Sequence, residues 1–184
     1  MGTYTVIPQD TFEAMQMDAG VLLKTFNPAS PAAPADADII TATTGGITIT
    51  AQPEFSDLGE DVDNCPNNTK ELKHLDSWTV TVSTTALGTS AAQIKMQLGC
   101  ADVTDNKITP RASLEQTDFT DLWWVGDKAG GGLVAAKISN ALSTSGFQLQ
   151  TSKNGKGQTT LELTGHVSIN AQDVVPIEFY SLDA

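Results

Sequence analysis

The stretch Leu122-Trp123-Trp124-Val125-Gly126-Asp127 decides the fold of this chain. Two adjacent tryptophans between Leu122 and Val125 indicate a buried strand, and Gly126-Asp127 indicates that this strand ends in a turn. No catalytic or metal-binding residue lies near this stretch in the sequence. Long β-elements without reactive side chains suggest a protein whose product is a surface or an assembly.

Further strands are predicted on both sides of this stretch, because apolar and polar residues alternate there and glycines mark turns. Trp78, Val80 and Val82 share one face of a strand at 78–83, and Asn154-Gly155 predicts a hairpin turn. The other predicted strands are 119–125, 133–138 after a turn at 130–132, 147–151, 159–164 with its continuation at 167–169, and 176–180, with strand, turn and strand over 39–51 around Gly45-Gly46.

One flanking α-helix is predicted near 90–98, within the stretch 89–99. Thr89 or Ser90 can cap its start, and Gly99 suits the position after its end. Its apolar stripe is Ala91, Ile94 and Leu98, which should lie on a sheet. Several strands with one docked helix predict a mainly β fold, a β-sandwich or barrel.

The 184 residues fit one domain with an arm before it. Residues 1–38 are predicted to be an N-terminal arm, because the connector 27–35 is rich in proline and alanine and suits neither helix nor central strand. Within the arm, 11–26 has a spacing that suits a short helix, although Gly20 argues against a continuous one. The domain covers 39–184 and includes a long acidic loop at 53–76, where periodicity is weak.

The charge is strongly acidic and uneven. The formal net charge is −12, and residues 1–69 hold ten acids against the single base Lys24. Such a surface repels phosphate, which argues against conventional nucleic-acid binding. No apolar run is long enough for a membrane span, and the first residues do not resemble a signal peptide, so synthesis in the cytosol is expected. Cys65 and Cys100 are expected to be free thiols.

The sequence offers little support for catalysis. His74 and His166 lie far apart and in no metal-binding spacing, and no serine has a nucleophile-elbow context. The acidic run 57–64 lacks the ligand order of a calcium loop, so a solvated or partner-facing loop is favoured. We therefore expect no enzyme activity, no catalytic residue, no metal and no cofactor.

Several segments, in consistent order over about 39–180, together resemble the major tail protein, or tail tube subunit, of long, non-contractile-tailed bacteriophages. They include the Gly-Gly strand, the acidic loop, the double tryptophan and the closing strand. The segments are 45–50, 57–70, 75–78, 108–111, 118–127, 140–148 and 164–180. The Pro/Ala-rich stretch 27–38 is less like the family.

This resemblance implies a tail tube fold of two packed antiparallel sheets, a flanking helix, an N-terminal arm and a long loop. It implies hexameric rings that stack into a tube, through which double-stranded DNA passes during ejection without specific binding. The implied partners are other copies of the chain, a tape measure protein, and tail tip, baseplate and terminator proteins. The implied location is the tail of a virion, after synthesis in the cytoplasm of a host bacterium.

Two sets of residues are candidates within this interpretation. We expect the arm and the acidic loop to reach adjacent subunits and to become ordered on assembly. The acids expected at contacts between subunits are Asp57, Glu60, Asp61 and Asp63. The candidate lumen-facing acids are Glu162 and Glu178 on strands, since an acidic wall repels DNA weakly and lets it slide.

Two alternatives stay open. A tube protein of a contractile injection or secretion device would share the fold but need an outer surface that binds a sheath. A carbohydrate-binding β-sandwich module would need an exposed aromatic platform, and exposure of both Trp123 and Trp124 would favour it.

Overall fold

The computed structural model describes residues 4, 6–8 and 10–183 and shows a mainly β fold, as predicted. The described residues form one α-helix, α1 (Ala91–Leu98), and two 3-10 turns, at Lys70–Leu72 and Gln116–Asp118. The strands are β1 (Gln16–Leu23), β2 (Thr43–Asp57), β3 (Lys73–Ala86), β4 (Ala101–Thr104), β5 (Lys107–Pro110), β6 (Thr120–Lys128), β7 (Leu133–Ser143), β8 (Leu149–Gln150), β9 (Gln158–Thr164) and β10 (Ile177–Leu182). No helix in this described part is long and apolar enough to cross a membrane.

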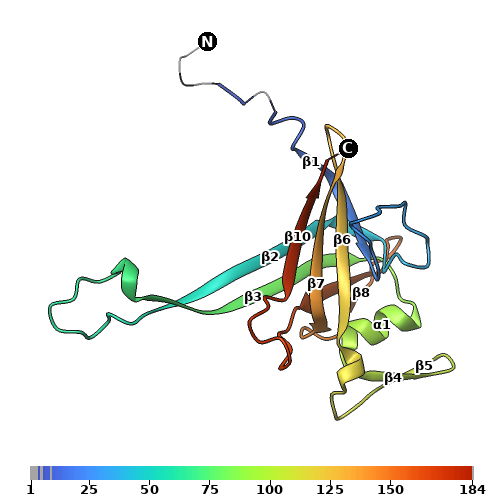
Figure 1. Ribbon diagram of the computed structural model, residues 1–184. Coiled ribbons are helices and arrows are strands. Elements are labelled where there is room, and N and C mark those ends of the chain that lie inside the picture. Colours follow the sequence, from blue (N-terminus) through green and yellow to red (C-terminus); the bar gives the residue numbers. More distant parts are fainter. Residues whose placement is uncertain (1–3, 5, 9, 184) are drawn as a thin grey trace.

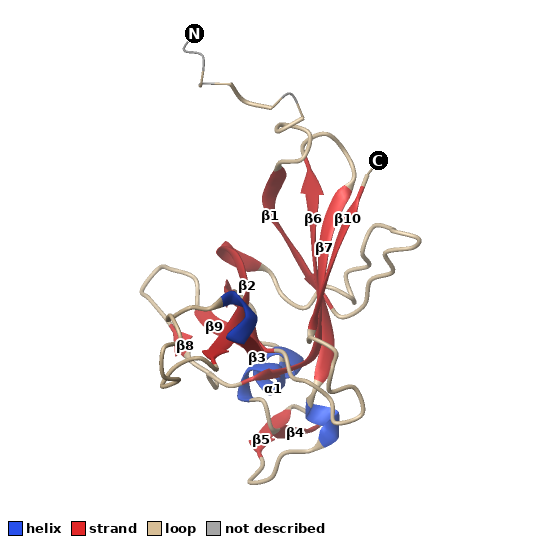
Figure 2. Cartoon of the chain, turned by 60° about the vertical axis from the view of Figure 1, so that its left-hand side comes forward, coloured by secondary structure: helices blue, strands red, loops and turns tan. Residues whose placement is uncertain are grey.

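Eight of the ten strands form two antiparallel sheets that share β7, and β4 pairs with β5 as a separate ribbon. Sheet A contains β1, β6, β7 and β10, and sheet B contains β2, β3 and β9, with short β8 beside β9. The first part of β7 pairs with β6 and β10, whereas Leu142 and Ser143 near its end pair with Thr164 and Leu163 of β9. In both views α1 and the β4–β5 ribbon lie at the end of the molecule away from the two chain termini (Figures 1 and 2).

The main core lies between the inner faces of the two sheets. It joins Leu122 and Ile138 of sheet A to Val80, Val82 and neighbouring residues of sheet B. Its buried members are Leu22, Ile40, Val80, Val82, Ala86, Leu122, Ala136, Ile138, Ala141, Leu161 and Leu163. Burial of one face explains why the alternation at 78–83 predicted its strand correctly.

The two tryptophans lie on opposite faces of sheet A, because successive side chains in a strand alternate. Trp124 packs against the main core, whereas Trp123 is 8% exposed and belongs to a second cluster with Leu23 and Ala135 on the outer face. The strand does not end at Gly126-Asp127 as predicted: both residues pair with β7, and the strand continues to Lys128.

The N-terminal boundary at residue 38 was wrong in one respect. Part of the expected arm is β1, an edge strand of sheet A in which Leu22 pairs with Trp124 and Leu23 with Trp123. The helix-like spacing at 11–26 did not indicate this strand, because Leu22 and Leu23 are adjacent in sequence but buried on opposite sides of the same sheet. The described residues before β1 lead away from the body (Figure 1). The connector 27–35 forms no helix or strand, as predicted.

The acidic loop is shorter than predicted, because β2 and β3 form one long hairpin. Their pairing runs from Thr43 opposite Ala86 to Asp57 opposite Lys73, so only 58–72 connects the strands. The outer half of this hairpin has polar residues on both faces, so its sequence lacks the alternation that burial imposes. Gly45-Gly46 is not a turn either; it forms a bulge within β2, where the register shifts between Thr44 and Ile47.

Helix α1 begins with the predicted cap, formed reciprocally by Ser90 and Gln93, and is followed by Gly99. Its deepest residue is not in the predicted apolar stripe: Gln97 is buried, whereas Ala91, Ile94 and Leu98 are only half-buried. The Gln97 amide donates to the Thr159 hydroxyl at 2.8 Å, and the Ser143 hydroxyl donates to the Gln97 carbonyl at 2.7 Å. Polar contacts therefore help to hold the helix on the strands, together with Met96, which packs against the main core. Residues 167–169 do not continue β9 as a strand.

Candidate assembly surfaces

The β2–β3 hairpin projects from the body (Figure 1). Several of its large apolar side chains are exposed to solvent. Phe55 and Leu75 are cross-strand partners, and they are 55% and 44% exposed. Leu58 and Val62 in the connecting loop are also exposed. A two-stranded ribbon is marginally stable in water on its own, and clustered exposed apolar groups mark interaction surfaces. The outer half of the hairpin is therefore suited to packing against another protein.

Asp57 closes the loop at the end of this hairpin. Its carboxylate accepts backbone N–H groups of Gly59 at 3.0 Å and Asn68 at 2.9 Å, one on each oxygen. These bonds, with nearby Lys73 adding a smaller effect, hold the pKa of Asp57 below its usual value, although burial opposes them. Among the four predicted contact acids, Asp57 thus has an internal structural role. Glu60, Asp61 and Asp63 are exposed on the loop.

The outer face of sheet B is rich in hydroxyl groups. We call it the threonine face; it comprises Thr48, Thr50, Gln52, Glu54, Ser77, Thr79, Thr81, Ser83, Thr85, Thr160, Glu162 and Thr164. Rows of cross-strand partners cover it, such as Thr48, Ser83 and Glu162. Its charged members are both acids, and Glu54 accepts hydrogen bonds from the hydroxyls of Ser77 at 3.0 Å and Thr79 at 2.8 Å. The face therefore offers DNA phosphates no cation.

The second predicted lumen acid, Glu178, lies elsewhere. It is exposed on β10 of sheet A, opposite Lys137 of β7. The Tyr180 hydroxyl donates to Glu178, and this hydrogen bond, with burial, raises the pKa of Tyr180. Because Glu162 and Glu178 lie on the outer faces of different sheets, a single wall built from one sheet face holds only one of them.

Sheet A has two edges at which another strand can pair. The strand β10 pairs only with β7, whereas β1 pairs with β6 and is bridged on its other side at Leu23 by Ile39, which leaves the first part of that side open. Phe179 of β10 is 62% exposed and makes that edge apolar as well as unpaired. Unprotected edges of this kind are templates for pairing between chains.

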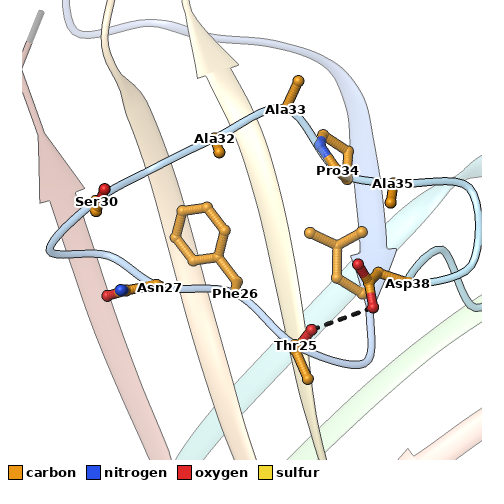
Figure 3. A pocket seen from close by; sticks show the side chains of 10 residues that line it. Thr25, Phe26, Asn27, Ser30, Ala32, Ala33, Pro34, Ala35 and Asp38 are labelled. Atoms are coloured by element: carbon orange, nitrogen blue, oxygen red, sulfur yellow. Dashed lines mark hydrogen bonds between the residues drawn. The ribbon is translucent and has the colours of Figure 1, made fainter.

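The connector covers the outer face of sheet A as a closed loop. Figure 3 shows Phe26 within this loop, with the Thr25 hydroxyl bonded to Asp38 across its neck at 3.3 Å. The Lys24 ammonium also reaches across and donates to the Ala37 carbonyl at 2.7 Å. The loop surrounds a depression of about 360 Å³ above Leu23. Phe26 meets Trp123 edge-on, with ring centroids 5.5 Å apart, so the connector covers the second core cluster.

His166 and the two tryptophans, which could have marked a reactive or binding site, make structural contacts within the fold. His166 follows β9, lies 3.1 Å from the Asn140 carbonyl and packs edge-on against Phe119. Among the described residues, no group of three or more His, Cys, Asp or Glu side chains is placed to hold a metal ion. Trp123 is buried and Trp124 is half-buried with its indole N–H bonded to the Ala19 carbonyl, so they form no exposed aromatic platform.

An ion cluster missed from the sequence fastens the segment 101–118. Arg111, with only 13% of its side chain exposed, meets Asp102 and Glu115 at 2.9 Å each and also Asp118. The carboxylate of Asp118 additionally accepts the backbone N–H of Glu115 at 2.8 Å. The available signal was Arg111 as the sole arginine among nearby acids, but Asp102 lies on β4 whereas Glu115 and Asp118 lie at the 3-10 turn, so the fold is needed to bring them together.

No family model matches the chain, and no curated protein matches it. Among solved structures, the chain is similar to one from the virion of a native gene transfer agent particle, with 12% identity and a TM-score of 0.44 over 88% of this chain and 95% of that chain. It is also similar to a chain from the tail of an empty gene transfer agent particle with C6 symmetry, with 10% identity and a TM-score of 0.38 over 82% and 92%. Likeness at this level leaves the function to be inferred from the surfaces of this chain itself.

Proposed function

We propose that this chain is a structural protein of a phage-type tail, and that it is the subunit of the tail tube. The observation that carries the proposal is the projecting β2–β3 hairpin with the exposed pair Phe55 and Leu75. A ribbon that carries exposed apolar side chains beyond its own core gains stability by packing on a neighbouring copy. The resemblance in sequence to tail tube subunits supports the same assignment.

The edges of sheet A supply a second direction of association. A heterologous contact that joins one edge of a subunit to a different edge of the next generates a closed ring when the rotation closes. The open edge of β10 and the open first part of β1 are suited to such a contact, and six copies per ring is the number implied by the sequence resemblance. The hairpin then joins one ring to the next.

The threonine face is the proposed wall of the tube. Double-stranded DNA carries one negative charge per about 1.7 Å, and cations on the wall would hold it by displacing counterions. A surface of hydroxyl groups with Glu54 and Glu162 gives DNA no such hold, so the genome can slide during ejection. In this arrangement Glu162 faces the lumen and Glu178 does not.

The remaining partners follow from a tube of defined length. We propose a tape measure protein inside it, tip or baseplate and terminator proteins at its ends, and a virion tail as its location. The chain has no enzyme activity in this proposal. A tube protein of a contractile device would have the same ring and stacking contacts, and isolation of tubes without a sheath partner distinguishes the two.

Removal of the hairpin loop tests the tube assignment. Replacing residues 59–70 with Asn-Gly removes most of the loop but keeps β2, β3 and their pairing within sheet B. We expect the wild-type protein to form tubes of stacked rings in negative-stain electron microscopy at high concentration or with its initiating tip complex. The shortened variant should keep its thermal unfolding midpoint and form no tubes. Wild-type protein that stays monomeric under all these conditions would overturn the assignment.

A further inference from the structure

The turn between β8 and β9 is the basic counterpart of the acidic hairpin loop. Lys153 and Lys156 are exposed on this turn, and neither forms an ion pair within the described part of the chain. Residues 146–158 contain no acid. Beside the turn lies a polar depression of about 350 Å³, lined by Lys156, Gln150 and Thr44 among others.

Several other basic residues are already paired or belong to the hairpin. Lys128 pairs with Asp183, Lys137 pairs with Asp121, and Arg111 lies in its ion cluster. Lys70 and Lys73 belong to the hairpin itself. Lys153 and Lys156 are therefore a pair of exposed lysines on one turn, outside the hairpin, with no ion pair among the described residues.

The hairpin loop has the opposite charge. Residues 58–69 hold the three acids Glu60, Asp61 and Asp63 and no basic residue. All three acids are exposed and have no cationic partner among the described residues. Because Asp57 fixes the ends of this loop through two backbone N–H groups, its acids are presented in a defined shape.

The two charged elements lie at opposite ends of one strand. The basic turn borders Thr44 at the start of β2, whereas the acidic loop follows Asp57 at its end. Thirteen residues of strand at about 3.3 Å each separate these ends by roughly 40 Å. No copy can satisfy its own acidic loop with its own basic turn, but two copies placed end to end can.

We propose that the acidic loop 58–69 of one copy docks on the Lys153–Lys156 turn and its polar depression in the next copy. This contact rests on the proposed tube function and identifies the surface that receives the hairpin. It is heterologous, so each copy offers one loop and one turn and the contact repeats along the assembly. The apolar groups of the hairpin add buried area, while the charges select the register.

This contact is tested by reversing the charges of the turn and of the loop separately, and then of both together. We expect Lys153→Glu with Lys156→Glu to raise the concentration needed for assembly by at least about tenfold, measured by sedimentation. The triple variant Glu60→Lys, Asp61→Lys, Asp63→Lys should have a similar defect. The variant with all five changes should recover assembly to within about threefold of wild type, because the attraction is restored with opposite signs.

The matched control is Lys107→Glu, a single reversal on the exposed β4–β5 ribbon, which should leave assembly unchanged. Thermal unfolding of each variant confirms that the monomer remains folded. Normal assembly of the double lysine variant, or no recovery in the five-residue variant, would overturn this contact while leaving the tube assignment intact. Wild-type protein that never assembles would instead overturn the tube assignment and this contact with it.

Discussion

At the scale of single residues, Asp57 shows how a charge in a candidate interface can belong to the fold instead. Its two oxygens accept the backbone N–H groups that bring the two ends of the loop together. Glu60, Asp61 and Asp63 have no such bonds and remain free for a partner. The sequence places these four acids in one group, since the hydrogen bonds that separate them depend on the folded path of the loop.

Two glycines with positive φ give a prediction at the same scale. Gly20 has φ +68, and an added Cβ would lie 2.5 Å from the Val125 carbonyl oxygen, whereas Gly45 has φ +79 and open space around it. Gly45→Ala therefore costs only backbone strain, about 1 kcal/mol. Gly20→Ala adds a clash with the backbone of β6 and should cost roughly 3 kcal/mol or more. Urea unfolding of the two variants measures the difference; equal costs would contradict the predicted clash.

At the scale of elements, the segment 101–118 should open in acid. The pKa of Asp118 lies below its usual value of 3.8, because the Glu115 backbone N–H donates to it and Arg111 pairs with it, although burial opposes the shift. Its contribution to stability is thus complete above about pH 4 and lost as the pH falls through the lowered pKa.

Amide signals of 102–118 in NMR spectra should change before those of the sheets as the pH is lowered from about 5 to about 2. The variant Asp118→Asn should show the altered signals throughout this range and lose the pH dependence. Simultaneous changes in the segment and the sheets would show that this ion cluster does not open independently.

Two kinds of sequence pattern gave correct strands. The strands at 78–83 and 159–164 alternate because one face meets the main core. The strand at 119–125 was predicted from its apolar run instead, since Leu122 and Trp124 meet the main core and Trp123 meets the second cluster. The outer hairpin has solvent on both faces, and β1 is buried only at its end, where Leu22 and Leu23 lie on opposite faces, so neither element has a period of two. The exposed pair Phe55 and Leu75 was also missed, although two large apolar residues within an acidic stretch were a usable signal.

At the scale of the whole molecule, the threonine face predicts how the wall treats DNA. Thr81→Lys with Glu162→Lys places cations on that face without changing the core, so tubes should still form. DNA should then bind the wall at low salt and leave the tube at least about tenfold more slowly, with the delay relieved by added salt. The control Thr104→Lys lies on β4, away from sheet B. Genome release from particles carrying each variant, followed by DNA dye fluorescence, measures the effect; equal rates would exclude this face as the wall.

The passage of β7 through both sheets has a mechanical consequence. A single covalent strand belongs to the two layers, so the layers cannot slide past each other without bending that strand. When a long assembly of such copies bends, the two-sheet body of each copy should therefore move as a rigid body. Bending must then occur in the β2–β3 hairpins that connect neighbouring bodies, because a slender two-stranded element can tilt while its ends stay attached.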